Sequence, residues 1–540
     1  MHLRQAACSY ARGMSDATAA GSPSSKLGRE TWLAIVAMGL AVFVIANDVT
    51  AMSVALPAIE NDFDTDVSVV QWVVNAYALI FGVLIVTGGR LADMFGRRRI
   101  LFIGAAIFAF FSLLGGMAPN VGVLIACRAL MGIGGAMMWP AILGLVYAIL
   151  PENRAPLAGA LVIGTAGIGN AIGPLLGGAL TDAWSWRWIL FLNVPIAAVT
   201  CLVTWRTVHV PNPAERNRID YAGIAAISIG LVALLVALGQ APDEGWGSPV
   251  VLGGFALSAV LLVSFFFIER RMRDDALVPG EVMGNGNFLS TCIVTMLMSA
   301  TFFAALLYLP QFFQKVLDYS PAAAGVALLP LMGTFALTSF VAGRLYERFG
   351  AKTMVTAGGV CIALATLLWS RIGPNSGYED LVPGMIVAGI GIGMFLSSVT
   401  TAGVTSLDPS RSSLAGGILY MFQIAGGAVG LGITTTVFLV GANRGLEDST
   451  SAAGADLTPD EMESVRGVLA GTDSSQAVVA KYAGQLGDQL VELVRDAFAT
   501  GLRWAFLLDG ALAVIGVVVS ALFVGGSVFA RRRAATASTS

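Results

Sequence analysis

Long apolar runs, separated by short polar segments, recur along most of the chain. A helix needs about 20 apolar residues to cross roughly 30 Å of hydrocarbon, and these runs reach that length. The runs are continuous, whereas a membrane β-barrel would show alternating segments of about ten residues. The pattern therefore predicts an all-α integral membrane protein. Its fourteen expected spans are 32–56, 70–92, 100–118, 121–148, 156–180, 187–206, 221–240, 250–268, 288–310, 323–345, 353–370, 381–405, 414–440 and 502–528.

Composition supports the membrane interpretation and excludes several function classes. Hydrophobic residues make up 56% of the chain and charged residues 12%, about half the charged share of a soluble domain, roughly 25%. The net charge of −3 gives no sign of a nucleic-acid partner. The chain has no Gly-x-x-x-x-Gly-Lys-[Ser/Thr] loop for ATP, and its two histidines lie outside the apolar runs. We therefore expect no enzyme activity, no metal, no cofactor and no use of ATP.

Basic residues predict the orientation of the chain in the membrane. Clusters such as Arg97–Arg99 and Arg531–Arg533 fall on one side if both termini are cytoplasmic, as the excess of Lys and Arg in cytoplasmic loops requires. This bias supports an even number of spans. Residues 1–31 lack the apolar core of a signal peptide, so we expect a disordered cytoplasmic tail there and a second cytoplasmic tail at 529–540.

Three short motifs recur in register about 255 residues later and pair each span with the span eight places further on. They are Gly89–Arg98, which returns as Gly343–Lys352; Leu56–Pro57, ending the first span, which returns as Leu309–Pro310, ending the ninth; and Arg154–Gly159, which returns as Arg411–Gly416. The repeat predicts two six-helix halves, 32–206 and 288–528, joined by a linker region, 207–287, with two extra helices. Within the second half, 441–500 is expected to be a polar extracytoplasmic loop in which Thr458–Glu461 begins a short helix.

Several motifs resemble the fourteen-helix drug:proton antiporter branch of the major facilitator superfamily, over roughly 32–528. The motifs are Gly89-x-Leu-Ala-Asp93-x-x-Gly96-Arg97-Arg98 between the second and third spans, Leu124-x-x-x-Arg128 in the fourth, Gly169-x-x-x-Gly173-Pro174-x-x-Gly177-Gly178 in the fifth, and Asp48-x-Thr50 in the first. The resemblance implies the major facilitator fold and proton-coupled antiport of amphipathic, often cationic, drugs by alternating access.

The resemblance also implies a setting and partners. We expect a multi-pass protein of the bacterial plasma (inner) membrane that acts as a monomer. Membrane lipids, protons and small amphipathic substrates would be its partners, and nucleic acid would not. Two alternatives remain open. The same machine could serve one endogenous lipid, siderophore or secreted metabolite, or the chain could be a channel or membrane sensor.

Asp48 and Arg128 are the candidate proton-coupling pair. A carboxylate inside a membrane helix is unfavourable by about 2.5–3.5 kcal/mol and is a functional candidate by default. Asp48 lies about eight residues and Arg128 about seven residues from the outer ends of their spans, so both lie roughly 10–12 Å deep. Burial opposes the charge on Asp48 and a nearby guanidinium favours it, so a modest movement could exchange a proton. The alternative is a fixed structural ion pair.

Two further groups are candidates for a gate and a hinge. By resemblance, Gly89, Asp93, Gly96, Arg97 and Arg98 form a cytoplasmic gate between the halves; ordinary positive-inside anchoring is the alternative. Small residues four apart allow close helix packing, and a proline favours a kink. The antiporter motif of Gly169, Gly173, Pro174, Gly177 and Gly178 is thus expected to form a tight, hinge-capable helix, or a plain packing contact.

Other polar residues in the apolar runs are weaker candidates. Asp509 is a second intramembrane acid that could handle protons, attract a cation or pair with Arg503. The remaining members of this group are candidates for a cavity lining or for interhelical hydrogen bonds. They are Thr50, Asn75, Tyr77, Asn170, Asn193, Tyr308, Tyr420 and Gln423.

Overall fold

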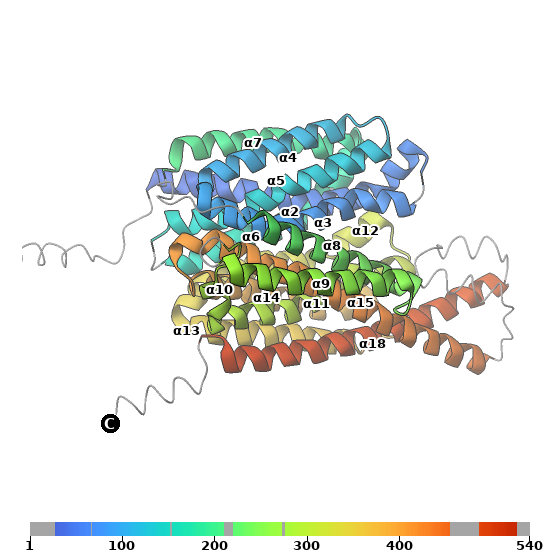
Figure 1. The fold of residues 1–540 in the computed structure, drawn as a ribbon. Coiled ribbons are helices and arrows are strands. Elements are labelled where there is room, and N and C mark those ends of the chain that lie inside the picture. The colour runs from blue at the N-terminus through green and yellow to red at the C-terminus, as the bar shows by residue number, and fades with distance from the viewer. Residues whose placement is uncertain are drawn as a thin grey trace, which may run out of the picture.

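The computed structural model describes residues 28–65, 67–151, 154–209, 220–272, 276–453 and 485–525. All regular elements in these ranges are helical, and the long helices run side by side in one bundle (Figure 1). The long apolar runs form helices because lipid offers no partner for a backbone amide, so each span must satisfy its own hydrogen bonds.

The helices follow the order that the repeat predicts. The first six are α2 (Arg29–Phe63), α3 (Val67–Phe95), α4 (Arg97–Gly116), α5 (Val121–Ile149), α6 (Ala155–Ala183) and α7 (Arg187–Thr207). The next two are α8 (Tyr221–Glu244) and α9 (Pro249–Met272). The last group is α10 (Gly280–Gly284), α11 (Gly286–Lys315), α12 (Pro321–Ala327), α13 (Leu329–Trp369), α14 (Tyr378–Val404), the 3-10 turn η3 (Pro409–Arg411), α15 (Ser412–Ala453) and α18 (Gln485–Phe523).

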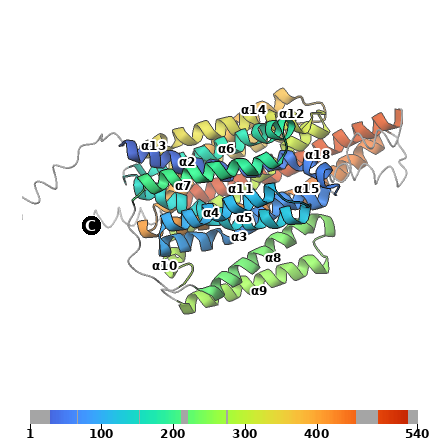
Figure 2. The same ribbon diagram turned by 90° about the horizontal axis from the view of Figure 1, so that it is seen from above.

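The bundle has two packed groups of helices and a peripheral pair. Buried apolar side chains form two clusters, one centred on α2–α7 and one on α11–α18. The pair α8 and α9 lies against one side of the bundle (Figure 2). Apolar side chains of α9 such as Val260 and Phe267 are exposed, as expected for a helix that faces lipid.

Thirteen described helices are long and apolar enough to cross a membrane. One of them, α13, has 41 residues and is interrupted at Gly350, whose φ of 78° and ψ of 167° are not helical. Each arm of α13 has about 20 residues and spans about 30 Å, so α13 supplies two crossings and the fourteen predicted spans are all accounted for. Gly96, 254 positions earlier, also has a positive φ, 99°, and separates α3 from α4 in the same way.

Two predicted helix ends are wrong. The spans were expected to end near Pro57 and Pro310, but α2 continues to Phe63 and α11 to Lys315, with each proline inside its helix. A proline removes one backbone hydrogen bond, and a membrane helix tolerates this loss where neighbouring helices pack around it. The end of α2 is instead set by Asp64, which adopts a left-handed conformation with φ of 48°.

The segment 441–500 is not simply a polar loop. Helix α15 continues to Ala453 and α18 begins at Gln485, and the two extend together beyond the rest of the bundle (Figure 1). Small residues allow this extension, because Gly441 and Gly445 face side chains of α18. An ion pair between Arg495 and Asp318 joins α18 to the segment that follows α11. The helix expected at Thr458–Glu461 lies outside the described residues.

Candidate functional site

Asp48 lies at a junction of three helices in the first half. Its side chain is completely buried on α2, and its two oxygens have different partners. Arg128 of α5 forms an ion pair with Oδ2, and the amide of Asn193 on α7 donates to Oδ1 over 2.8 Å. The structure therefore brings the two predicted charges into direct contact and adds a neutral hydrogen-bond donor.

Arg128 is itself held in a fixed orientation. Its Nε donates to the backbone carbonyl of Val73 on α3 over 2.9 Å, and its guanidinium carbon lies 4.6 Å from the centre of the Tyr77 ring. Its Nη2 has no hydrogen-bond partner among the described residues. A buried charge of this kind depends on its counter-charge, so any change at Asp48 acts directly on Arg128.

Asn193 was predicted to line a cavity or to form interhelical hydrogen bonds, and the structure shows the hydrogen bonds; its contact with the proton site was not predicted. It reaches Asp48 from the sixth span and also donates to Ser112 Oγ of α4 over 3.1 Å. An amide inside an apolar run was the available signal, but several runs contain one. Which amide meets the acid depends on helix packing, which periodicity alone does not give.

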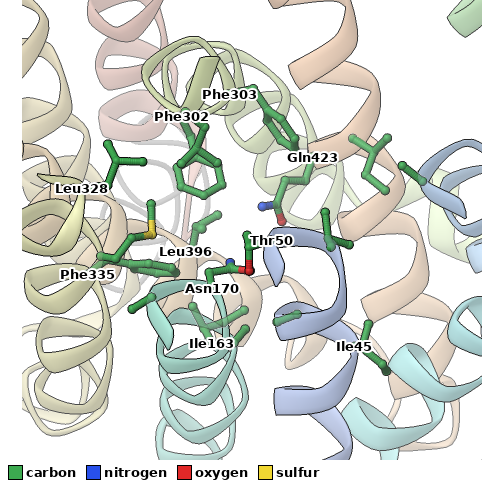
Figure 3. A pocket seen from close by; sticks show the side chains of 18 of the residues that line it. Ile45, Thr50, Ile163, Asn170, Phe302, Phe303, Leu328, Phe335, Leu396 and Gln423 are labelled. Carbon is green, nitrogen blue, oxygen red and sulfur yellow. The ribbon is translucent and has the colours of Figure 1, made fainter. Parts of the chain in front are cut away.

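A cavity of about 240 Å³ lies between the two halves, next to this junction (Figure 3). Its wall is apolar and aromatic, with a few uncharged polar side chains. The lining residues are Ile45, Ala46, Val49, Thr50, Tyr77, Ala78, Phe81, Trp139, Ile163, Ala166, Asn170, Ala171, Pro174, Phe302, Phe303, Leu306, Gly325, Leu328, Leu329, Met332, Phe335, Leu396, Tyr420, Gln423 and Ile424.

Five of the predicted polar residues line this cavity. They are Thr50, Tyr77, Asn170, Tyr420 and Gln423. Asn75 is exposed on α3, two positions before Tyr77, and does not line the cavity because successive helical positions point in different directions.

Asp509 is buried in the second half, away from the cavity wall. Its Oδ1 accepts a hydrogen bond from Thr434 of α15 over 2.8 Å, and Oδ2 has no partner among the described residues. Arg503 is exposed and forms no ion pair with Asp509 in the described part of the chain. The pairing with Arg503 considered above is therefore wrong, since six positions along a helix place the two side chains on different faces.

The acidic residue of the first loop motif connects the two halves. Asp93 at the end of α3 accepts from Arg97 Nε over 3.0 Å and from the backbone amides of Ser413 and Leu414 over 3.3 and 2.8 Å. Arg97 also donates to the carbonyl of Pro409 over 2.6 Å. One acid and one base thus bind α3 and α4 to η3 and the beginning of α15, at the end of the bundle expected to face the cytoplasm.

The other residues of this motif have separate tasks. Arg98 donates to the carbonyls of Val208 and Trp205 at the end of α7, so it acts within the first half. An added Cβ at Gly89 would lie 2.7 Å from a carbonyl oxygen of α15. The positive φ of Gly96 makes the one-residue break between α3 and α4.

The glycines of α6 allow it to approach α2 closely. An added Cβ would lie 2.9 Å from a backbone oxygen of α2 at Gly169, 1.9 Å from the Thr50 hydroxyl at Gly173 and 2.4 Å from a backbone oxygen at Gly177. At Gly178 the nearest atom would be 3.9 Å away, so this glycine is not required for the contact. Pro174 lines the cavity and faces Gly325 of α12.

Comparisons with known proteins agree with this architecture. The profile of the Major Facilitator Superfamily matches residues 38–431. A puromycin resistance protein of Streptomyces alboniger is 35% identical over 416 residues, which cover 75% of this chain and 81% of the relative. A tetracenomycin C resistance and export protein of Streptomyces glaucescens is 28% identical over 508 residues, covering 93% of each chain.

Solved structures give the same fold. A bacterial homologue of the human lysosomal transporter Spinster, in an inward-facing and occupied conformation, aligns with a TM-score of 0.55 at 17% identity, covering 92% of this chain and 97% of that chain. The human organic anion transporter MFSD10 aligns with a TM-score of 0.56 at 13% identity, covering 91% and 100%. By profile, relatives and fold, this multi-pass membrane protein belongs to the major facilitator superfamily of transporters.

Proposed function

We propose that the protein exports amphipathic drugs in exchange for protons, by alternating access and with the proton gradient as its only source of energy. The observation that carries this proposal is the pairing of Asp48, fully buried, with Arg128 and Asn193, beside a cavity shared by both halves. A buried acid in contact with a base, next to a cavity that fits a small molecule, is the arrangement that proton exchange requires.

Protonation of Asp48 would change the contacts of α2. The proton removes the carboxylate charge and weakens the ion pair that holds α2 to α5, leaving Arg128 in need of another partner. Two side chains carry this change to the cavity. Thr50 lies two residues from Asp48 on α2, and Tyr77 packs under the guanidinium; both also line the cavity.

The contacts between the halves supply the alternating gate. The gate is supported by two contacts at the predicted cytoplasmic end, from Asp93 to the beginning of α15 and from Arg97 to η3. Release of these contacts would open that end. The close α2–α6 contact lets α2 respond as one body with α6, which makes the glycine motif part of the mechanism as well as of the packing.

Several further properties follow from this proposal. The two Streptomyces relatives support drug export, because one is named a puromycin resistance protein and the other a tetracenomycin C resistance and export protein. We place the protein in the bacterial plasma membrane as a monomer with both termini cytoplasmic. It carries out transport rather than catalysis and has no role with nucleic acid.

The test is gradient-driven efflux from proteoliposomes. Vesicles loaded with a fluorescent amphipathic drug are placed in acidic buffer, and efflux is followed for wild type, Asp48→Asn and Asp64→Asn. Asparagine mimics a permanently protonated Asp48, so this variant should bind the drug but lose gradient-driven efflux. Asp64→Asn, an exposed change at the end of the same helix that suits its left-handed backbone, should behave as wild type.

The outcomes separate the alternatives. Equal gradient-driven efflux from Asp48→Asn and wild type would make the Asp48–Arg128 pair structural and remove it from coupling. Efflux that does not depend on the proton gradient in any variant would indicate a channel. Failure of a broad panel of drugs, with proton exchange supported by one cellular lipid or metabolite, would assign the machine to an endogenous cargo.

A further inference from the structure

The cavity wall carries no charge on any of its described lining residues, although both halves contribute to it. Asp48 is the acid of the adjacent junction, yet it is fully buried and is not part of the wall. Its oxygens are already bound by Arg128 and Asn193. A substrate in the cavity therefore meets no free carboxylate.

The polar groups of the wall include two amides and a threonine hydroxyl that point toward one another (Figure 3), besides the polar atoms of Tyr77, Tyr420 and Trp139. Thr50 and Asn170 come from the first half and Gln423 from the second. Asn170 and Gln423 form no hydrogen bond with another described residue, so each amide keeps a donor and an acceptor for a ligand. A molecule bound to both amides would bridge the two halves.

An organic cation should bind weakly at this site. An ion that moves from water into an apolar cavity without a counter-charge loses more solvation free energy than it gains from contacts with the wall. Aromatic faces attract cations, but the Tyr77 ring already holds the guanidinium of Arg128 and stacks on Phe81 with ring centres 5.7 Å apart. Trp139 and Tyr420 likewise pack on each other at 4.6 Å.

The same wall suits flat uncharged rings. Phe302 and Phe335 on the second half, with ring centres 6.1 Å apart, line the same cavity as the Tyr77 and Phe81 pair of the first half. Rings favour offset and edge contacts with such side chains. A polar atom on the ring would reach the amides.

We infer that the cavity binds uncharged, planar aromatic molecules with hydrogen-bonding groups in preference to organic cations of the same size. The inference deepens the proposed function and rests on it. Because no acid of the wall is shared between proton and substrate, Asp48 acts on the substrate indirectly, through Thr50 and Tyr77. Exchange of a neutral molecule for protons also moves net positive charge inward in each cycle.

The test compares two ligands of one shape. The full-length protein in lipid nanodiscs is titrated with 10-methylacridone, which is neutral and has a carbonyl acceptor, and with 10-methylacridinium, which has the same three rings and a fixed charge. Wild type should bind the acridone about tenfold more tightly. Equal binding, or tighter binding of the acridinium, would overturn the inference and leave proton-coupled export intact.

A charge placed in the wall should reverse the preference. Gln423→Glu keeps the shape of the side chain and adds a carboxylate, so acridinium should now bind about tenfold more tightly than acridone. Gln314→Glu, the same change at an exposed position near the end of α11, is the matched control and should leave both affinities unchanged. An unchanged preference in Gln423→Glu, with the variant folded, would show that the ligands bind elsewhere.

If neither ligand binds wild type, the cavity is not the site for flat aromatic molecules and the inference fails. Gradient-driven efflux of a drug panel, measured as above, then decides separately whether the protein is an exporter. Failure of the charge preference and failure of export are thus read from different measurements on the same protein.

Discussion

The two halves each bury one aspartate completely, but they surround it differently. Asp48 of the first half meets a guanidinium and an amide, whereas Asp509 of the second half meets only a threonine hydroxyl. An ionised carboxylate without a counter-charge is very unfavourable in an apolar interior. Burial alone therefore does not make a proton site: we expect Asp48, which has a cation as its partner, to take part in proton exchange, and Asp509 to be uncharged and structural.

The repeat relates the surroundings of Asp48 and Asp509 to equivalent positions in the two halves. Thr301 stands 253 positions after Asp48, and its hydroxyl lies 3.4 Å from the backbone oxygen of Asp509. Thr366 stands 254 positions after Ser112 and lies beside Gly510. Both halves therefore keep a polar junction of equivalent helices, but the acid sits on the first helix of one half and on the last helix of the other.

The largest effect is expected from breaking the charged junction. Arg128→Met leaves Asp48 buried without its cation, and removal of one partner of a buried pair destabilises by about 3–5 kcal/mol. We expect a markedly lower melting temperature in detergent and no gradient-driven efflux. Asp48→Asn combined with Arg128→Met removes both charges and should recover most of the melting temperature while efflux stays absent. Recovery of efflux in the double variant would contradict a coupling role for the pair.

The next effect compares the two copies of the loop motif. Asp93 binds the opposite half, whereas its counterpart Glu347 is exposed and forms no ion pair among the described residues. Asp93→Asn should therefore lower the efflux rate by about tenfold, a change of about 1.4 kcal/mol, and Glu347→Gln by less than about twofold. Cysteines placed on α3 and α15 would report the gate directly, since Asp93→Asn should slow their crosslinking. Equal losses in both variants would mean that the motif acts through general charge rather than through this contact.

Membrane voltage offers a third comparison, between energy sources. If the cavity carries neutral molecules, each cycle moves protons inward without an outgoing charge, so an interior-negative potential should accelerate export even without a pH difference. One proton across 100 mV gains about 2.3 kcal/mol. Substrate-dependent currents on a supported membrane should appear for 10-methylacridone and disappear in Asp48→Asn. An exporter of monovalent cations that exchanges one proton for each would give no current.

Close helix packing at glycine should occur in both halves, whereas the proton site occurs only in the first half. Gly173 and Gly430, 257 positions apart, leave 1.9 and 2.2 Å between an added Cβ and the neighbouring helix. Alanine at either position should destabilise by about 1–3 kcal/mol through overpacking. Gly178→Ala, with its nearest atom at 3.9 Å, should be neutral in thermal unfolding. Only Gly173→Ala should also change ligand affinity, because its neighbour Thr50 lines the cavity.

The sequence predicted the membrane spans and the repeat, because the thickness of the lipid layer sets the length of each helix. It also predicted that Asp48 and Arg128 lie at the same depth in the membrane, because charged residues are rare in apolar runs. It could not place Asn193 on Asp48 or separate Asn75 from the cavity, since these depend on helix rotation and on contacts across more than a hundred residues. The sequence did not predict that both ends of 441–500 are helical, because polar residues are typical of loops. These helical ends depend on tertiary packing, in which Gly441 and Gly445 lie against α18. The local sequence pattern thus predicts how deep a side chain lies in the membrane, whereas tertiary packing decides which side chains it contacts.

The smallest effect is expected at the second acid, and it is the sharpest test of the comparison. Asp509→Asn keeps the hydrogen bond from Thr434 and replaces an uncharged acid by an uncharged amide. Gradient-driven efflux should stay within about twofold of wild type, and the free energy of unfolding should change little, because the hydrogen bond from Thr434 is kept. Thr434→Val, which removes the donor, should lower the free energy of unfolding by about 0.5–1.5 kcal/mol, the contribution of one hydrogen bond, and leave efflux unchanged. A loss of efflux in Asp509→Asn as large as in Asp48→Asn would mean that a cation is not needed to make a buried carboxylate exchange its proton, and that both halves take part in coupling.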